Sequence, residues 1–369
     1  MALKRSQAPA GTLVVLDHDS QILNGNPWGD PHRRKLAVWL PPQYGQGRRF
    51  PALYDLVGFT GSGLGHVGWK PFGDNVPQRA ARLIHEGKMG PVIMVFPDCF
   101  TALGGNQYIN SSAVGNYADY LTQEIIPFVD RNFNTLPSRD HRGCFGKSSG
   151  GYGAIVHGMK YSKYWGAVAD HSGDAYFEFV YWHDWPNTLN ELSKHRRPGR
   201  KEGDYDALAS SRSRSLSAGL DDGRIQRFLK SVWKREKLSS AEVHCIMNLC
   251  MAATYDPDPK APLGFRVPFN LESGEALPER WRRWREHDPI NLIGRHRSSL
   301  KSLRGIYLDC GWRDQYHIHY GMRILSKRLA EAGIRHRYQE FDDNHSDVDY
   351  RMDVSLPFLY KALKPARGA

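Results

Sequence analysis

The chain has 369 residues, of which 40% are hydrophobic and 24% charged, and it carries ten Trp, eighteen Tyr and fifteen Phe. Such a composition can bury a large core, and it excludes an intrinsically disordered chain or a small binding module. The formal net charge of +11 raises the question of a nucleic-acid partner, but the basic residues cluster only weakly and no nucleic-acid-binding motif accompanies them. We therefore expect a solvated, charged surface and no nucleic-acid partner.

The cysteines and the apolar runs exclude further classes of protein. Five cysteines are scattered without a Cys-x-x-Cys pair, which favours buried free thiols over a disulfide framework or a zinc site; they are Cys99, Cys144, Cys245, Cys250 and Cys310. The first residues lack the apolar run of a secretory signal, and no stretch approaches the roughly 18 apolar residues of a membrane span. The sequence predicts a soluble, cytoplasmic protein without a membrane partner, or a secreted one if a signal has been removed.

Short apolar, β-branched runs closed by Gly, Pro or Asp predict buried strands at 36–40, 52–57, 92–96, 143–145, 167–169, 305–308 and 337–341. Helical patterns lie between them at 76–86, 117–132, 151–159, 318–332 and 348–363. Strands that alternate with helices predict an α/β fold with a mostly parallel central sheet, flanked by helices on both faces.

One region breaks this alternation. Residues 173–289 are rich in Trp, Arg, Ser and Pro and contain an aromatic cluster around Trp182, together with helical pieces such as 223–235. We interpret this region as an insertion between a first core part, 1–172, and a second core part, 290–369. It is large enough to fold over a site as a cap, although a structural elaboration away from any chemistry is the alternative.

The segment 143–154 follows a predicted strand and opens a predicted helix, and residues 146–150 within it fit Gly-x-Ser-x-Gly. This spacing is that of a nucleophile elbow, a turn so sharp that a side chain two residues before or after the serine would collide with backbone. Ser148 is the predicted nucleophile, at the carboxyl edge of the sheet and near a helix N-terminus. Ser149 is a poorer candidate, because Lys147 stands where its frame would need the first glycine.

A serine hydroxyl needs a base to accept its proton and an acid to orient that base. His345 follows the last predicted strand and precedes the last helix, so it is the predicted base. Asp314 lies in the loop after the strand at 305–308 and is the favoured acid. The carboxylates that compete with it are Asp309, Asp342 and Asp343.

Backbone N–H groups are expected to stabilise the oxyanion. One donor is the N–H of Ser149, and the other comes from the glycine-rich loop 58–63, with Phe59 preferred and Thr60 next. Substrate contacts are expected from Thr60, Trp69, Lys147 and Trp182, although Phe59 and Trp69 could equally be packing residues. Neither a metal nor a cofactor is expected.

With these residues in place, the chain resembles the putative esterase family of α/β-hydrolases, which includes esterase D, enterochelin esterases and feruloyl esterases. The stretches that carry the resemblance are 38–44, 51–58, 95–98, 120–133, the elbow, 310–314 and 344–346. The resemblance implies a catalytic triad of Ser148, Asp314 and His345. Lys147 and Ser149 depart from the His and Met of the esterase D branch, which argues against S-formylglutathione as substrate. The oxyanion loop also departs from the His-Gly-Gly type of many relatives.

The sequence thus predicts a serine carboxylic-ester hydrolase that works through an acyl-enzyme, with a small-molecule ester as its partner. The aromatic insertion suggests an aryl or bulky ester, of the feruloyl, aromatic or siderophore type. Acyl transfer on the same triad is an alternative, and a non-catalytic binding protein on a hydrolase fold is a third.

Overall fold

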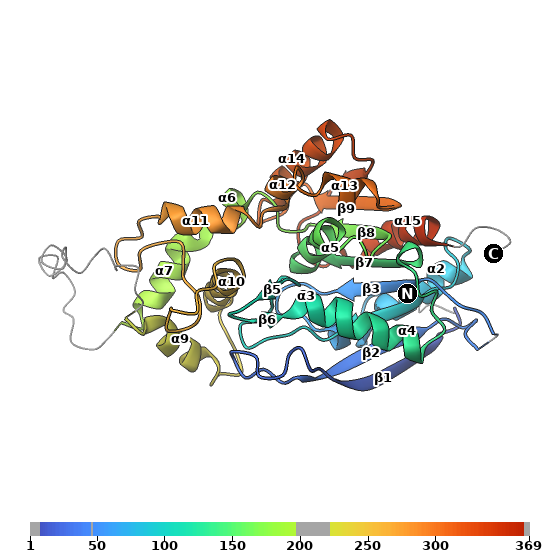
Figure 1. Cartoon of the computed structure of the whole chain (residues 1–369), viewed down its shortest axis with the longest axis horizontal. Helices are drawn as coiled ribbons and strands as arrows, with labels where there is room; N and C mark the ends of the chain where they lie inside the picture. The colour runs from blue at the N-terminus through green and yellow to red at the C-terminus, as the bar shows by residue number, and fades with distance from the viewer. Residues whose placement is uncertain (1–7, 46, 197–221, 365–369) are drawn as a thin grey trace, which may run out of the picture.

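A computed structural model describes residues 8–45, 47–196 and 222–364 (Figure 1). Its main sheet has eight strands in the order β1-β2-β4-β3-β7-β8-β9-β10. The strands are β1 (Thr12–Asp19), β2 (Arg33–Leu40), β3 (Ala52–Leu56), β4 (Ile93–Pro97), β7 (Arg142–Lys147), β8 (Ala167–His171), β9 (Gly305–Gly311) and β10 (Arg337–Phe341). All neighbours from β4 to β10 are parallel, while β1 and β2 are antiparallel additions at one edge. The predicted mostly parallel α/β sheet is confirmed.

Helices cover both faces of this sheet. They are α1 (Gly63–Val67), α2 (Val76–His85), α3 (Tyr117–Asp119), α4 (Ile126–Asn132), α5 (Ser149–Lys160), α12 (Pro289–Leu292), α13 (Arg297–Lys301), α14 (Ile318–Glu331) and α15 (Met352–Leu363), with the short turns η1 (Tyr120–Ile125), η2 (Arg139–His141) and η6 (Val348–Arg351). Alternate residues of β3 enter two separate cores: Tyr54 and Leu56 pack with α5, and Leu53 packs with α2 and α15. This alternation of buried side chains is what a sheet covered on both sides requires.

Two elements differ from the sequence expectation. The strand β1 was not predicted, because it is an edge strand whose apolar residues Leu13 and Val15 are exposed and form no buried run. The single helix expected at 117–132 is α3, a π-helical turn η1 and α4 in succession. Pro127 lies at the start of α4 and lacks the N–H of a regular helical bond, so a wider turn before it accommodates its ring.

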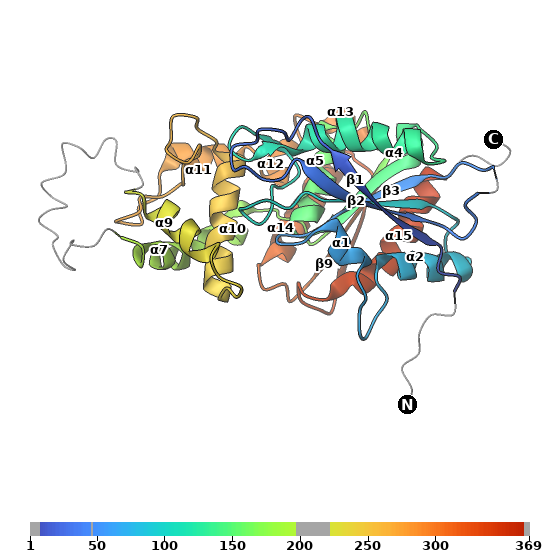
Figure 2. The same ribbon diagram turned by 90° about the horizontal axis from the view of Figure 1, so that it is seen from below.

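The segment 173–289, interpreted above as an insertion, contributes helices and no strand of the main sheet within its described residues. These helices are α6 (Phe177–Val180), α7 (Trp185–Ser193), α9 (Arg224–Val232), α10 (Ser240–Tyr255) and α11 (Pro278–Arg285), with the turn η3 (Trp182–Asp184). Figures 1 and 2 both show α7, α9, α10 and α11 gathered beyond one end of the sheet. A smaller two-stranded sheet, β5 (Asn110–Ser111) and β6 (Gly115–Asn116), lies against α10, where the Ser111 hydroxyl donates to the carbonyl of Ala253 at 2.6 Å.

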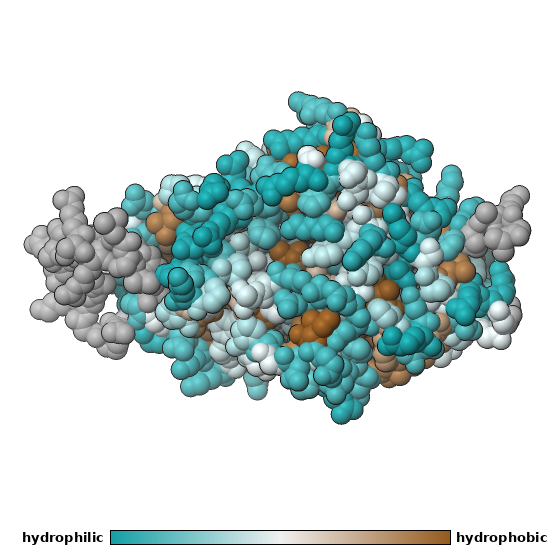
Figure 3. All heavy atoms as spheres, viewed as in Figure 1, coloured by the Kyte–Doolittle hydropathy of each residue, from teal (hydrophilic) through white to brown (hydrophobic). Residues whose placement is uncertain are grey.

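All five cysteines are free and buried, which confirms the expected thiols. Figure 3 shows that hydrophilic residues cover most of one face of the molecule, with apolar residues in separate patches. Among the helices of the described residues, none has both the length and the apolar character that crossing a membrane requires.

Asp288 joins the two ends of the insertion. Its buried carboxylate accepts hydrogen bonds from the backbone N–H of Phe177 at 2.9 Å and Tyr176 at 3.3 Å, and it also caps α12 by accepting from Ile290 at 3.0 Å. Burial raises the pKa of Asp288 to about 6, although the three N–H donors favour the charged form. The carboxyl group therefore binds a proton more readily in the folded chain than in the unfolded one.

This pKa predicts a pH dependence of stability. Because the folded-state pKa is raised, the contribution of Asp288 is fully present below about pH 4 and is lost as the pH rises towards 6, by up to about 3 kcal/mol. Urea unfolding of the wild type and of Asp288→Asn across this range measures the effect. We expect the difference between the two unfolding free energies to change between pH 4 and 6 and to stay constant above it; a pH-independent difference would contradict the assignment.

Candidate active site

The turn between β7 and α5 holds Ser148 in an unusual backbone conformation, with φ 57° and ψ −126°. A Cβ atom at Gly146 would lie 2.1 Å from the carbonyl oxygen of Leu56, and one at Gly150 would lie 1.7 Å from the same oxygen. Both glycines are therefore required by the close approach of β3, as the motif predicts. Ser148 itself is partly exposed, while Ser149 is buried as the first residue of α5.

His345 and Asp314 meet beyond the ends of β10 and β9. The Nδ1 atom of His345 lies 2.7 Å from Oδ2 of Asp314, and both side chains are buried. Gly311, at the end of β9, makes this contact possible, because a Cβ atom there would lie 2.4 Å from the carbonyl oxygen of Asp343. The loop that carries His345 can thus cross directly over the loop that carries Asp314.

The electrostatic environment of Asp314 favours its charged form. Burial alone would raise the pKa of this carboxyl group, but the hydrogen bond and charge of His345 and the backbone N–H groups of Tyr316 and Ile318 together lower it. The Tyr316 N–H donates to Oδ1 at 2.9 Å, so both carboxylate oxygens are engaged. An ionised Asp314 at Nδ1 is the partner that the imidazole of His345 needs if its Nε2 is to accept a proton.

The other carboxylates considered as the acid have different partners. Asp309 accepts from His171 at 2.6 Å, within the sheet. Asp342 forms an exposed ion pair with Arg313, and Asp343 accepts from the hydroxyl of Tyr350 at 3.0 Å. Of the four candidates, Asp314 is the one that contacts His345.

Ser148 belongs to the same edge of the sheet as this pair. The strands β7, β8, β9 and β10 are consecutive and parallel, so their carboxyl ends lie together. Backbone hydrogen bonds continue past the strand ends: Ser148 donates to the carbonyl of His171 at 2.9 Å, and Ser172 donates to that of Asp309 at 2.8 Å. The predicted nucleophile, acid and base therefore follow strands that end at one edge.

The loop after β3 lies against Ser148, since a Cβ atom at Gly58 would be 3.6 Å from Cβ of Ser148. In this loop the N–H of Thr60 donates to the carbonyl of Gly104 at 2.8 Å, so it is already engaged. Within the described residues, no backbone hydrogen bond uses the N–H of Phe59. The ring of Phe59 packs over Gly104, which makes Phe59 a packing residue whose N–H is still available.

The structure separates the residues expected to contact substrate. Trp69 is 70% exposed, in the segment between α1 and α2. Lys147 is half-buried beside Ser148, and its charge interacts with Asp349 of η6. Trp182 stacks on Trp185 at 4.5 Å inside the insertion. Within residues 8–45, 47–196 and 222–364, no hydrogen bond, ion pair or ring contact joins Trp182 to Ser148, Asp314 or His345.

Two polar clusters near His345 were not foreseen. Tyr316 packs edge-on against the His345 ring at 4.8 Å, and its hydroxyl lies 3.5 Å from Nε2 of His244 in α10. His244 in turn forms a 3.1 Å ion pair with the buried Asp184, which raises the pKa of His244. The insertion thus reaches His345 through Tyr316. The sequence offered one signal for Tyr316, which is its position two residues after the predicted acid Asp314.

The second cluster surrounds Asp174, which follows β8 as Asp314 follows β9. Oδ2 of Asp174 accepts from the amide of Gln107 and from the hydroxyl of Tyr181, both at 2.7 Å. Burial raises the pKa of Asp174, and its charge interacts with those of His345 and Asp314. A polar residue just past a parallel strand was the sequence signal for this group.

Comparison with known proteins identifies the family. The family model described as Putative esterase matches residues 31–355. The chain belongs to the Putative esterase family. Its fold is the α/β-hydrolase fold.

Two curated relatives are Esterase Rv1288 and Esterase MT1326, from two strains of Mycobacterium tuberculosis, each 33% identical over 147 residues. The match spans 38% of this chain and only 29% of the length of each relative. These relatives are therefore much longer than the segment they share with this chain.

Solved structures with the same fold include a ferulic acid esterase (TM-score 0.57, 17% identity, 95% of this chain and 98% of that one). A feruloyl esterase module from Clostridium thermocellum, complexed with sinapinate, has a TM-score of 0.55 at 13% identity over 100% of this chain and 94% of that one. An S-formylglutathione hydrolase from Agrobacterium tumefaciens has a TM-score of 0.53 at 16% identity, covering 98% and 99%. At these identities the likeness concerns the fold.

The elbow geometry gives a direct prediction. Gly150→Ala places a methyl group 1.7 Å from the carbonyl oxygen of Leu56, so we expect loss of the elbow and destabilisation by more than about 3 kcal/mol. Gly65→Ala in α1 is the matched control, because nothing lies within 4 Å of the added carbon there. Denaturant unfolding and ester hydrolysis compare the two variants. If Gly150→Ala and Gly65→Ala were equally stable, the carbonyl of Leu56 could not lie this close to residue 150.

Proposed function

We propose that the chain hydrolyses carboxylic esters through an acyl-enzyme, with Ser148 as nucleophile, His345 as general base and Asp314 as the orienting acid. The observation that carries the proposal is the buried 2.7 Å contact between Nδ1 of His345 and Oδ2 of Asp314, at the sheet edge where the Ser148 turn also ends. Family membership supports the reaction class.

The chemistry follows from the protonation states. The Nδ1–H of His345 donates a hydrogen bond to the Asp314 carboxylate, so Nε2 keeps a free lone pair. Nε2 then accepts the Ser148 proton as Oγ bonds to the ester carbonyl carbon. The tetrahedral intermediate then expels the alcohol, which takes the proton from His345. Water attacks the acyl-enzyme by the same route, and the proton returns to Oγ as the carboxylic acid leaves.

Backbone donors would stabilise the oxyanion of both intermediates. The N–H of Ser149, at the N-terminus of α5, and the N–H of Phe59 are the proposed pair. The N–H of Thr60 already donates a hydrogen bond to the carbonyl of Gly104, which favours Phe59 over Thr60 for this role.

We further propose an aryl or bulky ester as substrate. Trp69 is 70% exposed, and Trp312, the residue directly after β9, is 49% exposed. Large exposed aromatic side chains next to a catalytic edge can bind an aromatic acyl group. The fold neighbours that act on feruloyl esters, or that bind sinapinate, support the same substrate class.

A fluorophosphonate probe tests the nucleophile. We expect the wild type to be labelled and Ser148→Ala to be unlabelled, because the probe reacts only with an activated serine. His345→Ala should lower kcat by several orders of magnitude, since the base is lost. Labelling that persists in Ser148→Ala would disprove the assignment.

The chain contains a second serine, histidine and aspartate in hydrogen-bonding contact, and this group serves as an internal control for the nucleophile assignment. His171 contacts Asp309 at 2.6 Å and the hydroxyl of Ser355 at 2.8 Å, which gives a second Ser–His–Asp arrangement. All three side chains are buried, so a substrate cannot reach them. Ser355→Ala is therefore expected to keep full labelling and turnover.

Trp69 tests the substrate class. Trp69→Ala should raise KM for methyl ferulate about tenfold, through loss of an aromatic contact of about 1.4 kcal/mol, and should leave p-nitrophenyl acetate unaffected. Phe100→Ala, at another exposed aromatic residue, is the control. An equal effect of Trp69→Ala on both esters would argue against a role in acyl recognition.

A further inference from the structure

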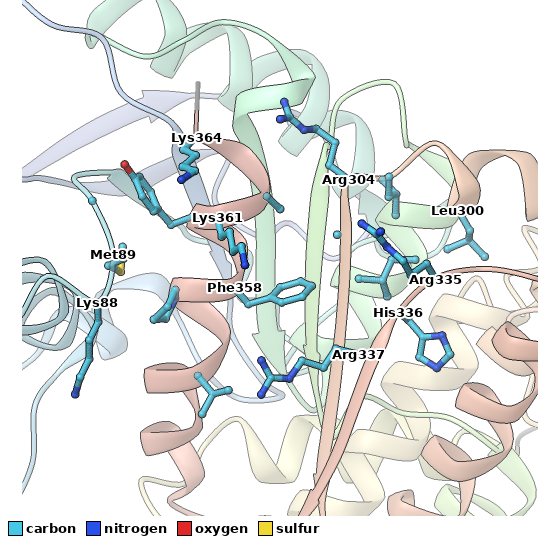
Figure 4. Close-up of a pocket in the computed structure, with 18 of the residues that line it drawn as sticks. Lys88, Met89, Leu300, Arg304, Arg335, His336, Arg337, Phe358, Lys361 and Lys364 are labelled. Atoms are coloured by element: carbon cyan, nitrogen blue, oxygen red, sulfur yellow. The ribbon is translucent and has the colours of Figure 1, made fainter. Parts of the chain in front are cut away.

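A hollow of about 1470 Å³ lies at the edge of the sheet opposite to the triad (Figure 4). Its walls come from the segment 87–90 before β4, the end of α13, the first residues of β9 and β10, and the outer face of α15. Because β9 and β10 are parallel and the triad residues follow their carboxyl ends, their amino ends lie at the other edge. The hollow is therefore separate from the proposed active site.

The lining of the hollow is strongly basic. Of the 21 residues that line the hollow, seven are Lys or Arg and none is Asp or Glu. One of the seven, Lys88, pairs with Glu86 at 2.8 Å. For the other six, no ion pair with a carboxylate occurs within the described part of the chain; they are Lys301, Arg304, Arg335, Arg337, Lys361 and Lys364.

Like charges also crowd together beside the hollow. A Cβ atom at Gly333 would lie 3.5 Å from Nζ of Lys301 and 3.9 Å from a guanidinium nitrogen of Arg297. Two cations this close to one point repel each other, and an anion placed between them relieves the repulsion. Folding has thus gathered positive charge here, whereas most basic residues elsewhere have acidic partners.

The remaining lining is apolar. Phe358, Leu303 and Tyr360 are partly exposed in the hollow, and Figure 4 shows Phe358 between the labelled basic side chains of Lys361 and Arg337. An anion made only of charged groups would leave this surface unused. A ligand with an apolar or aromatic body and several negative charges would use both parts.

We propose that this hollow binds a polyvalent organic phosphate, with its phosphate groups on Arg335, Arg337 and Lys361 and its body against Phe358. Arginine forks match phosphate oxygens bidentately, and a chain of phosphates supplies the multiple charges that uncompensated cations need. The volume exceeds the roughly 300–1000 Å³ of most small-molecule sites and so accommodates a ligand of nucleotide size. A nucleic-acid duplex fits less well, because the cations line a hollow with an apolar wall.

Calorimetric titration of the full chain with ATP and with tripolyphosphate tests the proposal. We expect ATP to bind more tightly than tripolyphosphate, because only ATP carries an aromatic body. The triple variant Arg335→Glu, Arg337→Glu, Lys361→Glu should bind ATP at least about tenfold more weakly. Its ester hydrolysis should equal that of the wild type, since these residues lie at the other edge of the sheet.

A second triple variant is the control, because it changes the net charge by the same amount as the first triple variant. Lys163→Glu, Lys234→Glu, Lys260→Glu reverses three exposed lysines outside the hollow and should bind ATP as the wild type does. Equal losses in both variants, or no binding of ATP by the wild type, would overturn the proposal. Tripolyphosphate binding as tight as ATP would overturn the role of the apolar wall. Tighter binding of a DNA duplex through the same three residues would replace the proposed ligand with a nucleic acid.

Discussion

Close approach of backbone to backbone at the carboxyl edge of the sheet is the constraint on which the candidate site depends. The carbonyl of Leu56 occupies the space that side chains at Gly146 and Gly150 would fill, and the carbonyl of Asp343 does the same at Gly311. The first approach forces the sharp turn that holds Ser148 with a positive φ. The second brings the His345 loop onto the Asp314 loop. Glycine at three positions therefore shapes the edge at which the residues of the proposed triad gather.

The chain contains two aspartate–histidine pairs, and position in the sheet gives them different roles. Asp309 lies within β9 and is enclosed with His171, Ser355 and Arg351, so this network holds β8, β9 and α15 together. Asp314 lies five residues further on, past the end of the strand. The same pairing of residue types is structural inside the sheet and available for chemistry at its edge.

The two edges of the sheet also differ in charge. At the carboxyl edge, Asp314 pairs with His345, and the insertion reaches His345 through Tyr316 and His244. At the amino edge, cations from the segment before β9, from the start of β10 and from α15 line a hollow that contains no Asp or Glu. Part of the positive charge of the chain therefore gathers in one hollow, beside the solvated basic residues that composition leads one to expect.

The sequence alone determined the parallel α/β fold and the elbow, because apolar periodicity and the glycine spacing of 146–150 are local signals. It also indicated Ser148 and His345, since each stands at a fixed place relative to a predicted strand. It left Asp314 beside three rival carboxylates, because hydrogen bonding between residues 31 positions apart depends on how two loops cross. Tertiary structure alone placed Tyr316 and Asp174 near His345, stacked Trp182 on Trp185, and gathered the basic hollow from segments between 87 and 364. Those contacts join distant parts of the chain, so the sequence positions of Tyr316 and Asp174 could mark them as candidates but could not show what they contact.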